Sequence, residues 1–180
     1  MSDFYTIDIA GLKRDLPLCR VNDDLYIAAF IIFGDVEVTK HCAAELLKRA
    51  PEYDVIITAE AKSIPLAYEM ARQSGKPYIV ARKGVKVYMR DPIEVQVRSI
   101  TTDHVQKLYL GMEDVEKIRG KRVLVVDDVI STGESLDAMY ALMDKAETNV
   151  VAACAVLAEG DAANRDDITF LNPLPLFFKD

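Results

Sequence analysis

The chain has 180 residues, 51% of them hydrophobic and 28% charged, which suits one globular domain with enough length for a hydrophobic core. Its formal net charge of −7 gives no overall attraction to nucleic acid or to an anionic membrane, so we expect neither as a partner. No apolar run approaches the ~20 residues of a membrane-spanning helix, no signal peptide is recognisable, and the three cysteines are too widely spaced for a CxxC pair, so a cytoplasmic protein with reduced thiols is expected.

The first half of the chain alternates between predicted strands and predicted helices. Apolar runs or polar–apolar alternation predict strands over residues 3–9, 24–33, 53–60 and 76–83. Apolar residues at helical spacing predict helices over residues 36–50 and 63–75. The first helix stops at Pro51, and the second has Pro65 near its start and Gly75 just past its end, which is the usual placement of these residues.

The second half continues the alternation and adds a hairpin. The pattern over residues 91–100 and 104–110 indicates two strands around a polar turn. The next elements expected are a strand that ends at Asp127 and Asp128, a helix over 133–147, a strand over 149–159 and a proline-interrupted C-terminus. Strands and helices in this order predict an α/β fold with a parallel sheet and helices on both faces.

Polar or charged residues follow three of the predicted strands. They occupy residues 58–62, 82–86 and 127–135. Ligands of parallel sheets bind beyond the carboxyl ends of the strands. We therefore expect these three segments to converge on one ligand site.

The turn after the third of these strands has the composition of a phosphate site. It consists of Ser131, Thr132, Gly133, Glu134 and Ser135. Backbone N–H groups at a helix start bind anions, the glycine allows a close backbone approach, and the hydroxyl groups add donors. The turn suits a phosphate monoester, and it is neither a Walker loop nor a GxGxxG loop.

Asp127 and Asp128 require a different ligand group, because two carboxylates repel a phosphate. They suit neutral hydroxyl groups or a cation, and a sugar phosphate offers hydroxyl groups beside its phosphate. A purely structural alternative is that Asp127 ends a strand and that Ser131 or Thr132 caps a helix. The complete string of residues 123–135 favours the ligand site.

The stretch VLVVDDVISTGES, residues 123–135, resembles the PRPP-binding signature of type I phosphoribosyltransferases. The resemblance extends over roughly residues 54–159, where VIITAEAKSIPLAYEMARQSGKPYIVARK is similar to the purine branch, in particular to its adenine and xanthine enzymes. The family implies one phosphoribosyltransferase domain over residues 1–180 with a parallel twisted sheet, a flexible hairpin lid over 92–110, and a small hood to which residues 1–50 and 160–180 contribute. It also implies a homodimer.

The resemblance implies a role for each polar segment. Asp127 and Asp128 are the implied catalytic acids and bind the ribose hydroxyl groups of PRPP, while the turn 131–135 binds its 5-phosphate. The implied pyrophosphate-binding residues are Ala61, Lys62, Ser63, Arg82, Lys83 and Lys86. The first three form a loop in which the family often has a non-proline cis peptide. The basic residues offset the charge of the pyrophosphate together with Mg²⁺, the implied cofactor, although a solvated loop is an alternative for residues 82–86.

The implied reaction transfers the phosphoribosyl group of PRPP to a purine base and releases pyrophosphate. Adenine is the first choice of base, but three features depart from adenine enzymes. VRSITTDHVQ lacks their Tyr- and Glu-containing lid segment, Lys62 stands in place of an arginine, and Glu134 stands in place of a glycine. The SITT segment, Ser99 to Thr102, is more similar to xanthine enzymes, so xanthine, hypoxanthine and guanine stay open.

No base-binding residue and no protein ligand of a metal is assigned from the sequence. Phe30, Ile31 and Phe33 suit either an apolar hood or the core, and residues 156–159 end a strand near the expected base. Two further readings stay open. The stretch EAKSIPLAY is also similar to the purine repressor of Gram-positive bacteria, which senses PRPP and binds DNA, and a pyrimidine or orotate enzyme of the same fold is a third possibility.

Overall fold

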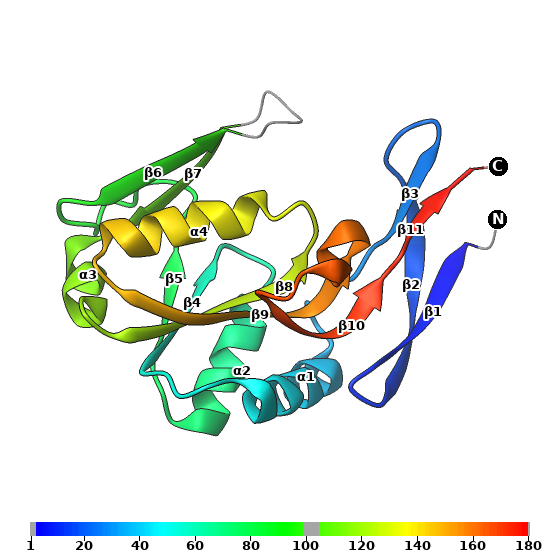
Figure 1. The fold of residues 1–180 in the computed structure, drawn as a ribbon, viewed down its shortest axis with the longest axis horizontal. Coiled ribbons are helices and arrows are strands. Elements are labelled where there is room, and N and C mark those ends of the chain that lie inside the picture. The colour runs from blue at the N-terminus through cyan, green and yellow to red at the C-terminus, as the bar shows by residue number, and fades with distance from the viewer. Residues whose placement is uncertain (1–2, 99–104, 180) are drawn as a thin grey trace.

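The computed structural model describes residues 3–98 and 105–179. Its centre is a five-stranded parallel sheet with the strand order β10-β9-β8-β4-β5 (Figure 1). The strands are β4 (Val55–Ala59), β5 (Tyr78–Ala81), β8 (Arg122–Ile130), β9 (Asn149–Glu159) and β10 (Thr169–Leu174). The predicted α/β fold with a parallel sheet is confirmed.

Helices cover both faces of this sheet (Figure 1). One face carries α1 (Val36–Arg49) and α2 (Ile64–Ser74), and the other carries α4 (Glu134–Lys145). The predicted hairpin is confirmed as β6 (Ile93–Arg98) and β7 (Val105–Leu110), which lies beside α4. Two short helices complete the chain: α3 (Met112–Ile118) before β8 and the 3₁₀ helix η1 (Gly160–Asn164) after β9. None of the helices among the described residues is both long enough and apolar enough to cross a membrane.

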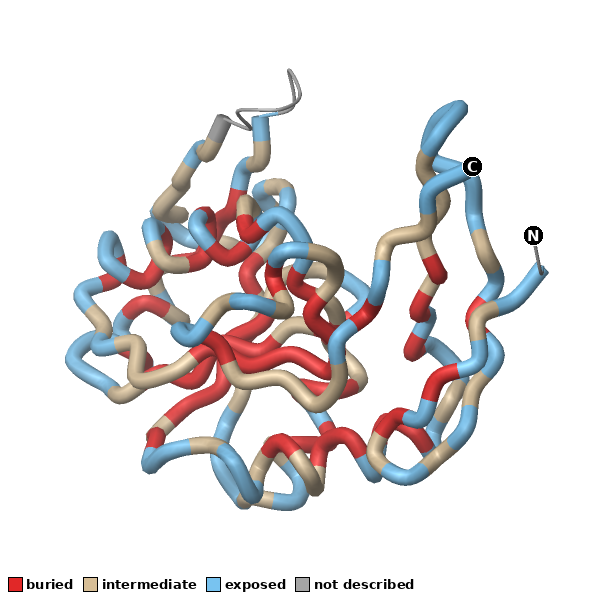
Figure 2. Tube along the Cα trace, turned by 45° about the vertical axis from the view of Figure 1, so that its right-hand side comes forward, coloured by how far each residue is buried: buried red, intermediate tan, exposed pale blue. Residues whose placement is uncertain are grey.

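The central strands are apolar on both sides because both of their faces are covered. Consecutive residues of β4 point to opposite faces: Ile57 packs in the cluster that includes Leu142 of α4, and Ile56 packs in the cluster that includes Leu66 of α2. All four side chains are almost fully buried, as is Leu124 of β8. Figure 2 shows the buried residues concentrated along these central strands. Their carboxyl ends are therefore held rigidly.

A second sheet stands beside the core and is formed by the two ends of the chain (Figure 1). It contains four antiparallel strands in the order β1-β2-β3-β11, which we call the outer sheet. The strands are β1 (Phe4–Ile9), β2 (Leu12–Arg20), β3 (Leu25–Ala28) and β11 (Leu176–Phe178). β1 was predicted, whereas β2 and β11 were not, because their short, proline-containing or highly charged stretches carry no clear local strand pattern.

The strand predicted over residues 24–33 is shorter than expected. β3 ends at Ala28, and the last backbone hydrogen bond to the neighbouring strand is donated by Ala29 to the carbonyl of Pro17. Beyond it the chain turns away to enter the core, with Gly34 at a φ of 82° just before α1. The apolar run reflects burial of every second residue and not a continuous ladder: Phe30 is buried while Ile31 is exposed.

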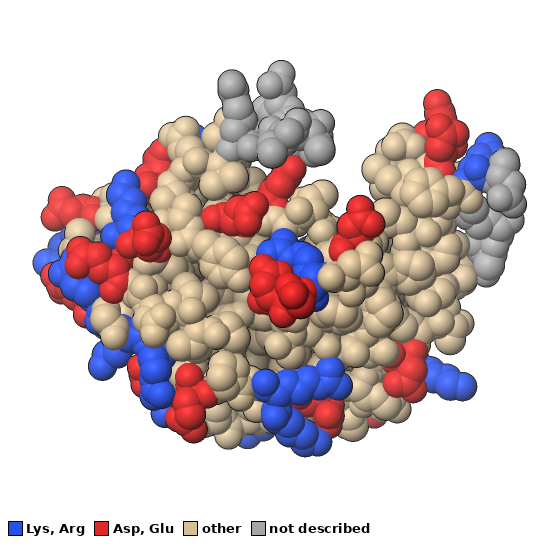
Figure 3. All heavy atoms as spheres, viewed as in Figure 1, with Lys and Arg blue, Asp and Glu red and all other residues tan. Residues whose placement is uncertain are grey.

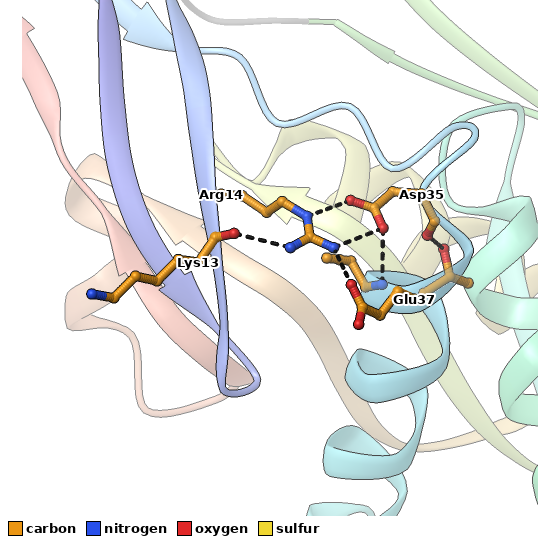
Figure 4. Close-up of polar contacts among 6 residues, drawn as sticks. Lys13, Arg14, Asp35 and Glu37 are labelled. Atoms are coloured by element: carbon orange, nitrogen blue, oxygen red, sulfur yellow. Dashed lines mark hydrogen bonds and ion pairs between the residues drawn. The ribbon is translucent and has the colours of Figure 1, made fainter.

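Arg14 joins the outer sheet to the start of α1 (Figure 4). Its Nε donates to Oδ2 of Asp35 at 2.7 Å and its Nη2 donates to Oδ1 at 3.2 Å, a bidentate arrangement. Nη2 also donates to Oε2 of Glu37 at 2.8 Å. Asp35 in turn accepts the N–H of Val38 at 3.0 Å and caps α1. Because α1 packs against α2 and β10, this cluster ties the outer sheet to the core.

We expect Arg14→Met to lower the Tm by a few degrees, because a partly exposed ion pair contributes little. Arg14 holds the pKa of Asp35 below its ordinary value through their hydrogen bonds. The stabilising effect should therefore be complete above about pH 4, the ordinary pKa of an aspartate, and disappear as the pH falls below it. Thermal unfolding across this range measures it. Arg20→Met is the control, because the partner of Arg20, Asp23, is not part of the core; equal pH dependence in both variants would contradict the prediction.

Candidate functional site

A cleft of about 360 Å³ lies at the carboxyl ends of β4 and β8. The predicted residues that line it are Ala61, Lys62, Ser63, Lys83, Asp127, Asp128 and Ser135. Segments that are far apart in the sequence are thus brought to one place, as the parallel order of the strands predicts. The lining also includes Glu60, which belongs to the predicted polar segment 58–62, and Gln106 and Leu108, to which the sequence assigned no individual role.

The sequence predicted a strand that ends at Asp127 and Asp128, but β8 extends beyond both acids. The strand continues to Ile130, and Asp127 pairs with Ala155 of β9. Asp128 is 3% exposed. Its Oδ2 is buried, accepts no hydrogen bond from the described residues, and lies 3.3 Å from Nζ of Lys62. The ion pair with Lys62 offsets part of the cost of burying this oxygen, and a ligand in the cleft that donates a hydrogen bond to it would offset more.

Asp127 is the acid with the strongly shifted pKa. Burial of its carboxyl group is the main cause, the adjacent Asp128 carboxyl adds to it, and together they raise the pKa to about 7. One stabilising contact is present, since Oδ1 of Asp127 accepts the backbone N–H of Asp128 at 2.8 Å. A buried carboxyl group with a raised pKa suits a ligand that offers hydroxyl groups or positive charge.

A buried hydrogen bond holds the loop after β4, residues 60–63, in place. Oγ1 of Thr58 donates to Oγ of Ser63 at 2.7 Å in a buried hydrogen bond. The peptide bond between Glu60 and Ala61 is cis, which agrees with the non-proline cis peptide expected in this loop. Pro65 follows in the first turn of α2. Lys62 is more than half exposed, so its ammonium group can reach a ligand in the cleft.

The basic residues after β5 are divided between two places. The backbone N–H of Lys83 donates to Oε2 of Glu60 at 2.9 Å, and Lys83 lines the cleft. Arg82 forms an ion pair with Glu60, and its Nη1 donates to the hydroxyl of Tyr88 at 2.6 Å. Neither Arg82 nor Lys86 is among the residues that line the 360 Å³ cleft. In this structure Glu60 therefore compensates the charge of Arg82.

The turn before α4 has the geometry of an anion site. Gly133 is the N-cap of the helix with a φ of 84°, a left-handed conformation that favours glycine. Ser131, Thr132 and Ser135 are exposed, and Glu134 is partly exposed. The hairpin reaches this turn, since Nε2 of Gln106 on β7 donates to Oγ of Ser135 at 3.1 Å. The expected lid segment Ser99–Thr102 lies outside the described residues.

The side chains considered for the base differ in exposure. Phe30 belongs to the core and is 6% exposed, whereas Ile31 and Phe33 are 57% and 52% exposed. At the end of β9, burial raises the pKa of the Glu159 carboxyl, which Lys62 partly offsets. Gln106 and Arg165 are polar residues at the site that no local pattern indicates, and Arg165 lies beside the turn before α4.

Three comparisons identify relatives of this chain. A model of the phosphoribosyl transferase domain matches residues 36–174. A hypoxanthine/guanine phosphoribosyltransferase of Methanococcus voltae is 38% identical over 112 residues, which are 62% of this chain and 56% of the relative. The purine biosynthesis transcriptional repressor PurR of Bacillus subtilis is 30% identical over 113 residues, which are 63% of this chain and 39% of that protein.

The fold agrees with this relationship. The crystal structure of an adenine phosphoribosyltransferase from Thermoanaerobacter pseudethanolicus superposes with a TM-score of 0.67 at 19% identity, over 79% of this chain and 84% of that one. This chain spans 56% of the length of the first relative and 39% of the second, while the family match covers most of it. The family model matches residues 36–174, and this segment contains the parallel sheet and most of the cleft. The chain therefore belongs to the phosphoribosyl transferase domain family.

Proposed function

We propose that this protein is an Mg²⁺-dependent purine phosphoribosyltransferase, with adenine as the first choice of base. The observation that carries the proposal is the cleft, in which Asp127 and Asp128, Lys62 and Ser135 meet. This set provides acceptors for hydroxyl groups, a cation for pyrophosphate and the start of an anion-binding helix in one place. Hypoxanthine, guanine and xanthine are the alternative bases, and the hypoxanthine/guanine relative supports the first two.

Each part of PRPP would have a counterpart in the cleft or in the adjoining turn 131–135, of which Ser135 lines the cleft. Asp127 and Asp128 would accept hydrogen bonds from the ribose hydroxyl groups, and the turn 131–135 would bind the 5-phosphate through its N–H groups. Ala61, Lys62, Ser63 and Lys83 would bind the pyrophosphate. Arg82 and Lys86 would then act at longer range, because Arg82 is paired with Glu60.

The residues fit Mg²⁺ as an ion bound mainly by PRPP. Among residues 3–98 and 105–179, no group of three or more His, Cys, Asp or Glu side chains could hold a metal ion alone. The buried Oδ2 of Asp128, which accepts no hydrogen bond from those residues, is suited to a ribose hydroxyl or to a water of such an ion. When bound, Mg²⁺ offsets the negative charge of the leaving pyrophosphate.

The reaction we propose is a displacement at C1 of the ribose. A purine ring nitrogen forms the new bond to C1, the bond from C1 to the pyrophosphate oxygen breaks, and pyrophosphate departs with the electron pair while the base loses a proton to solvent. The chain contributes alignment of the ribose, positive charge at the leaving group through Lys62, and exclusion of water by the hairpin. The hydrogen bond from Gln106 to Ser135 supports a hairpin that closes over the turn 131–135, which we call the phosphate turn.

Nucleotide formation tests the proposal directly. The protein is incubated with Mg²⁺, PRPP and adenine, hypoxanthine, guanine, xanthine or orotate, and the products are separated. We expect one purine to be converted, and the Asp127→Asn/Asp128→Asn double variant to be inactive. Conversion of orotate alone would replace the purine assignment, and PRPP binding without conversion of any base would overturn the enzyme assignment.

A PRPP-binding regulator is the second candidate, and the match to PurR supports it. The charge is less favourable, since a net charge of −7 opposes DNA binding. Figure 3 shows Lys and Arg side chains interspersed with Asp and Glu on the visible face, without an extended basic patch. Retardation of DNA in a gel that depends on PRPP would support the regulator, and its absence would favour the enzyme.

The setting we propose is a homodimer in the cytoplasm. Val87 and Tyr88, in the segment after β5, and Tyr68 on α2 are exposed apolar side chains that would suit a subunit interface. Tyr68 stacks edge-on against Tyr78, which lines the same cavity as Tyr88. The three cysteines are free thiols, which suits a reducing compartment. Sedimentation of the wild type and of Val87→Asp tests the dimer.

A further inference from the structure

The proposed phosphate site lacks a cation of its own. The turn 131–135 contains no Lys or Arg, and Asp127 and Asp128 precede it. The first turn of α4 adds the acids Glu134 and Asp137. A phosphate monoester carries close to two negative charges at neutral pH, and backbone N–H groups carry only partial positive charge. A cation from elsewhere in the chain would balance this acidic surrounding.

Arg165 brings a guanidinium group to this turn, with Nη1 left over from its ion pair with Asp167. It follows η1, after the end of β9, and its side chain is 29% exposed. Nε donates to Oδ1 of Asp167 at 2.8 Å and Nη2 donates to Oδ2 at 2.6 Å. This bidentate pair fixes the plane of the guanidinium group. The remaining nitrogen, Nη1, faces the phosphate turn.

Gly133 shows how close this approach is. A Cβ atom added to Gly133 would lie 2.5 Å from Nη1 of Arg165, which is well inside van der Waals contact. The residue at this position must therefore lack a side chain for Arg165 to lie against the turn, in addition to its positive φ. Nη1 of Arg165 therefore lies directly beside the backbone of the turn at Gly133.

We propose that Arg165 is a further binding residue of this site and recognises the 5-phosphate of PRPP. The proposal rests on the proposed function, since it assumes that a sugar phosphate occupies the turn. The Asp167 pair orients the guanidinium group, so that Nη1 can donate to a phosphate oxygen without a new rotamer being selected. No local sequence pattern connects Arg165 with Gly133; the parallel pairing of β8 and β9 places the loops that follow these strands at the same edge of the sheet.

Calorimetric titration of the intact protein with two ligands tests the role. Ribose 5-phosphate probes the turn 131–135, because it carries the 5-phosphate. Pyrophosphate, added with Mg²⁺, probes the proposed pyrophosphate site at Lys62 instead. In Arg165→Gln we expect the Kd of ribose 5-phosphate to rise about tenfold or more, as for loss of a charge-assisted hydrogen bond, with the Kd of pyrophosphate unchanged. Lys62→Gln should show the reverse pattern. Arg119→Gln, an exposed arginine before β8 that is paired with Glu147, is the control for net charge.

The outcomes separate this role from the proposed function. An unchanged Kd of ribose 5-phosphate in Arg165→Gln would overturn the role of Arg165, even if the wild type forms nucleotide. Tight binding of ribose 5-phosphate that depends on Arg165, without conversion of any base, would keep the role and overturn the enzyme. If Arg165→Gln weakened the binding of both ligands equally, the role of Arg165 would also be overturned, because an equal loss indicates a general structural effect. If Arg165→Gln does not fold, as judged by circular dichroism, Arg165→Met keeps the apolar stem and replaces it in the same titrations.

Discussion

Asp128→Asn is expected to reduce kcat/KM for PRPP by about 10²–10³-fold, the usual cost of removing one group that stabilises a transition state. Asparagine has the same shape, so the buried site should keep its fold. The substitution removes the negative charge beside Lys62 and one acceptor oxygen. In the wild type Oδ2 is buried and accepts no hydrogen bond from the described residues, so it is available to a ligand. An amide NH₂ in that place would point a donor at a ribose hydroxyl and at Lys62.

Initial rates at saturating base measure this effect, with kcat and the KM for PRPP determined separately. The matched control is Asp144→Asn, an exposed acid in the last turn of α4, at the opposite end of the helix from the phosphate turn. It loses the same charge without touching the cleft, so its rates should equal those of the wild type. Activity of Asp128→Asn within about threefold of the wild type would show that Asp128 does not bind the reacting sugar.

Asp127→Asn is expected to make the protein more stable at neutral pH while it loses activity. Burial, and then the adjacent Asp128 carboxyl, raise the pKa of Asp127 in the folded state to about 7. The unfolded chain has an ordinary aspartate pKa of about 3.9. Ionisation is therefore less favourable in the folded state, and the cost is removed by a neutral asparagine. Such a gain is typical of residues kept for function at the expense of stability.

The pH window follows from the sign of this shift. Below about pH 4 Asp127 is protonated in both states and does not penalise folding. As the pH rises from there through about 7, the wild type loses stability, and above this range the loss is complete. Because Asp127 is partly exposed, solvent screens part of the effect, and we expect about 1–3 kcal/mol between the two variants at pH 8.

Urea unfolding of the wild type and of Asp127→Asn at several pH values from 4 to 8 measures the difference in the free energy of unfolding. The two curves should converge toward pH 4 and separate toward pH 8. Asp144→Asn is again the control, and its difference from the wild type should stay nearly constant. A wild type that is more stable than Asp127→Asn at pH 8 would show that the Asp127 carboxylate is stabilised in the fold, contrary to the shift derived from its burial.

The sequence by itself determined the order of the core strands up to β9 and the chemistry at the strand ends, whereas β10, in the proline-interrupted C-terminal part, was not predicted. Continuous apolar runs, such as Val123–Val126, predict strands that are buried on both faces. Pro65 and Gly75 indicate the two ends of a helix. These are local signals, carried by neighbouring residues in the chain. The same holds for the acids and the turn 131–135, whose residue types at adjacent positions suit a sugar phosphate. The resemblance to phosphoribosyltransferases depends on this contiguous segment.

The tertiary structure alone decided which distant residues meet. The strand β2 is made regular by its pairing with β1 and β3, although its own residues are charged and include Pro17. The C-terminal strand β11 joins β3 from the other end of the chain. Likewise Glu60 neutralises Arg82, Gln106 reaches Ser135, and Arg165 lies against Gly133. Such contacts follow from sheet order and from loops that close over one edge, and residue spacing along the chain does not encode them.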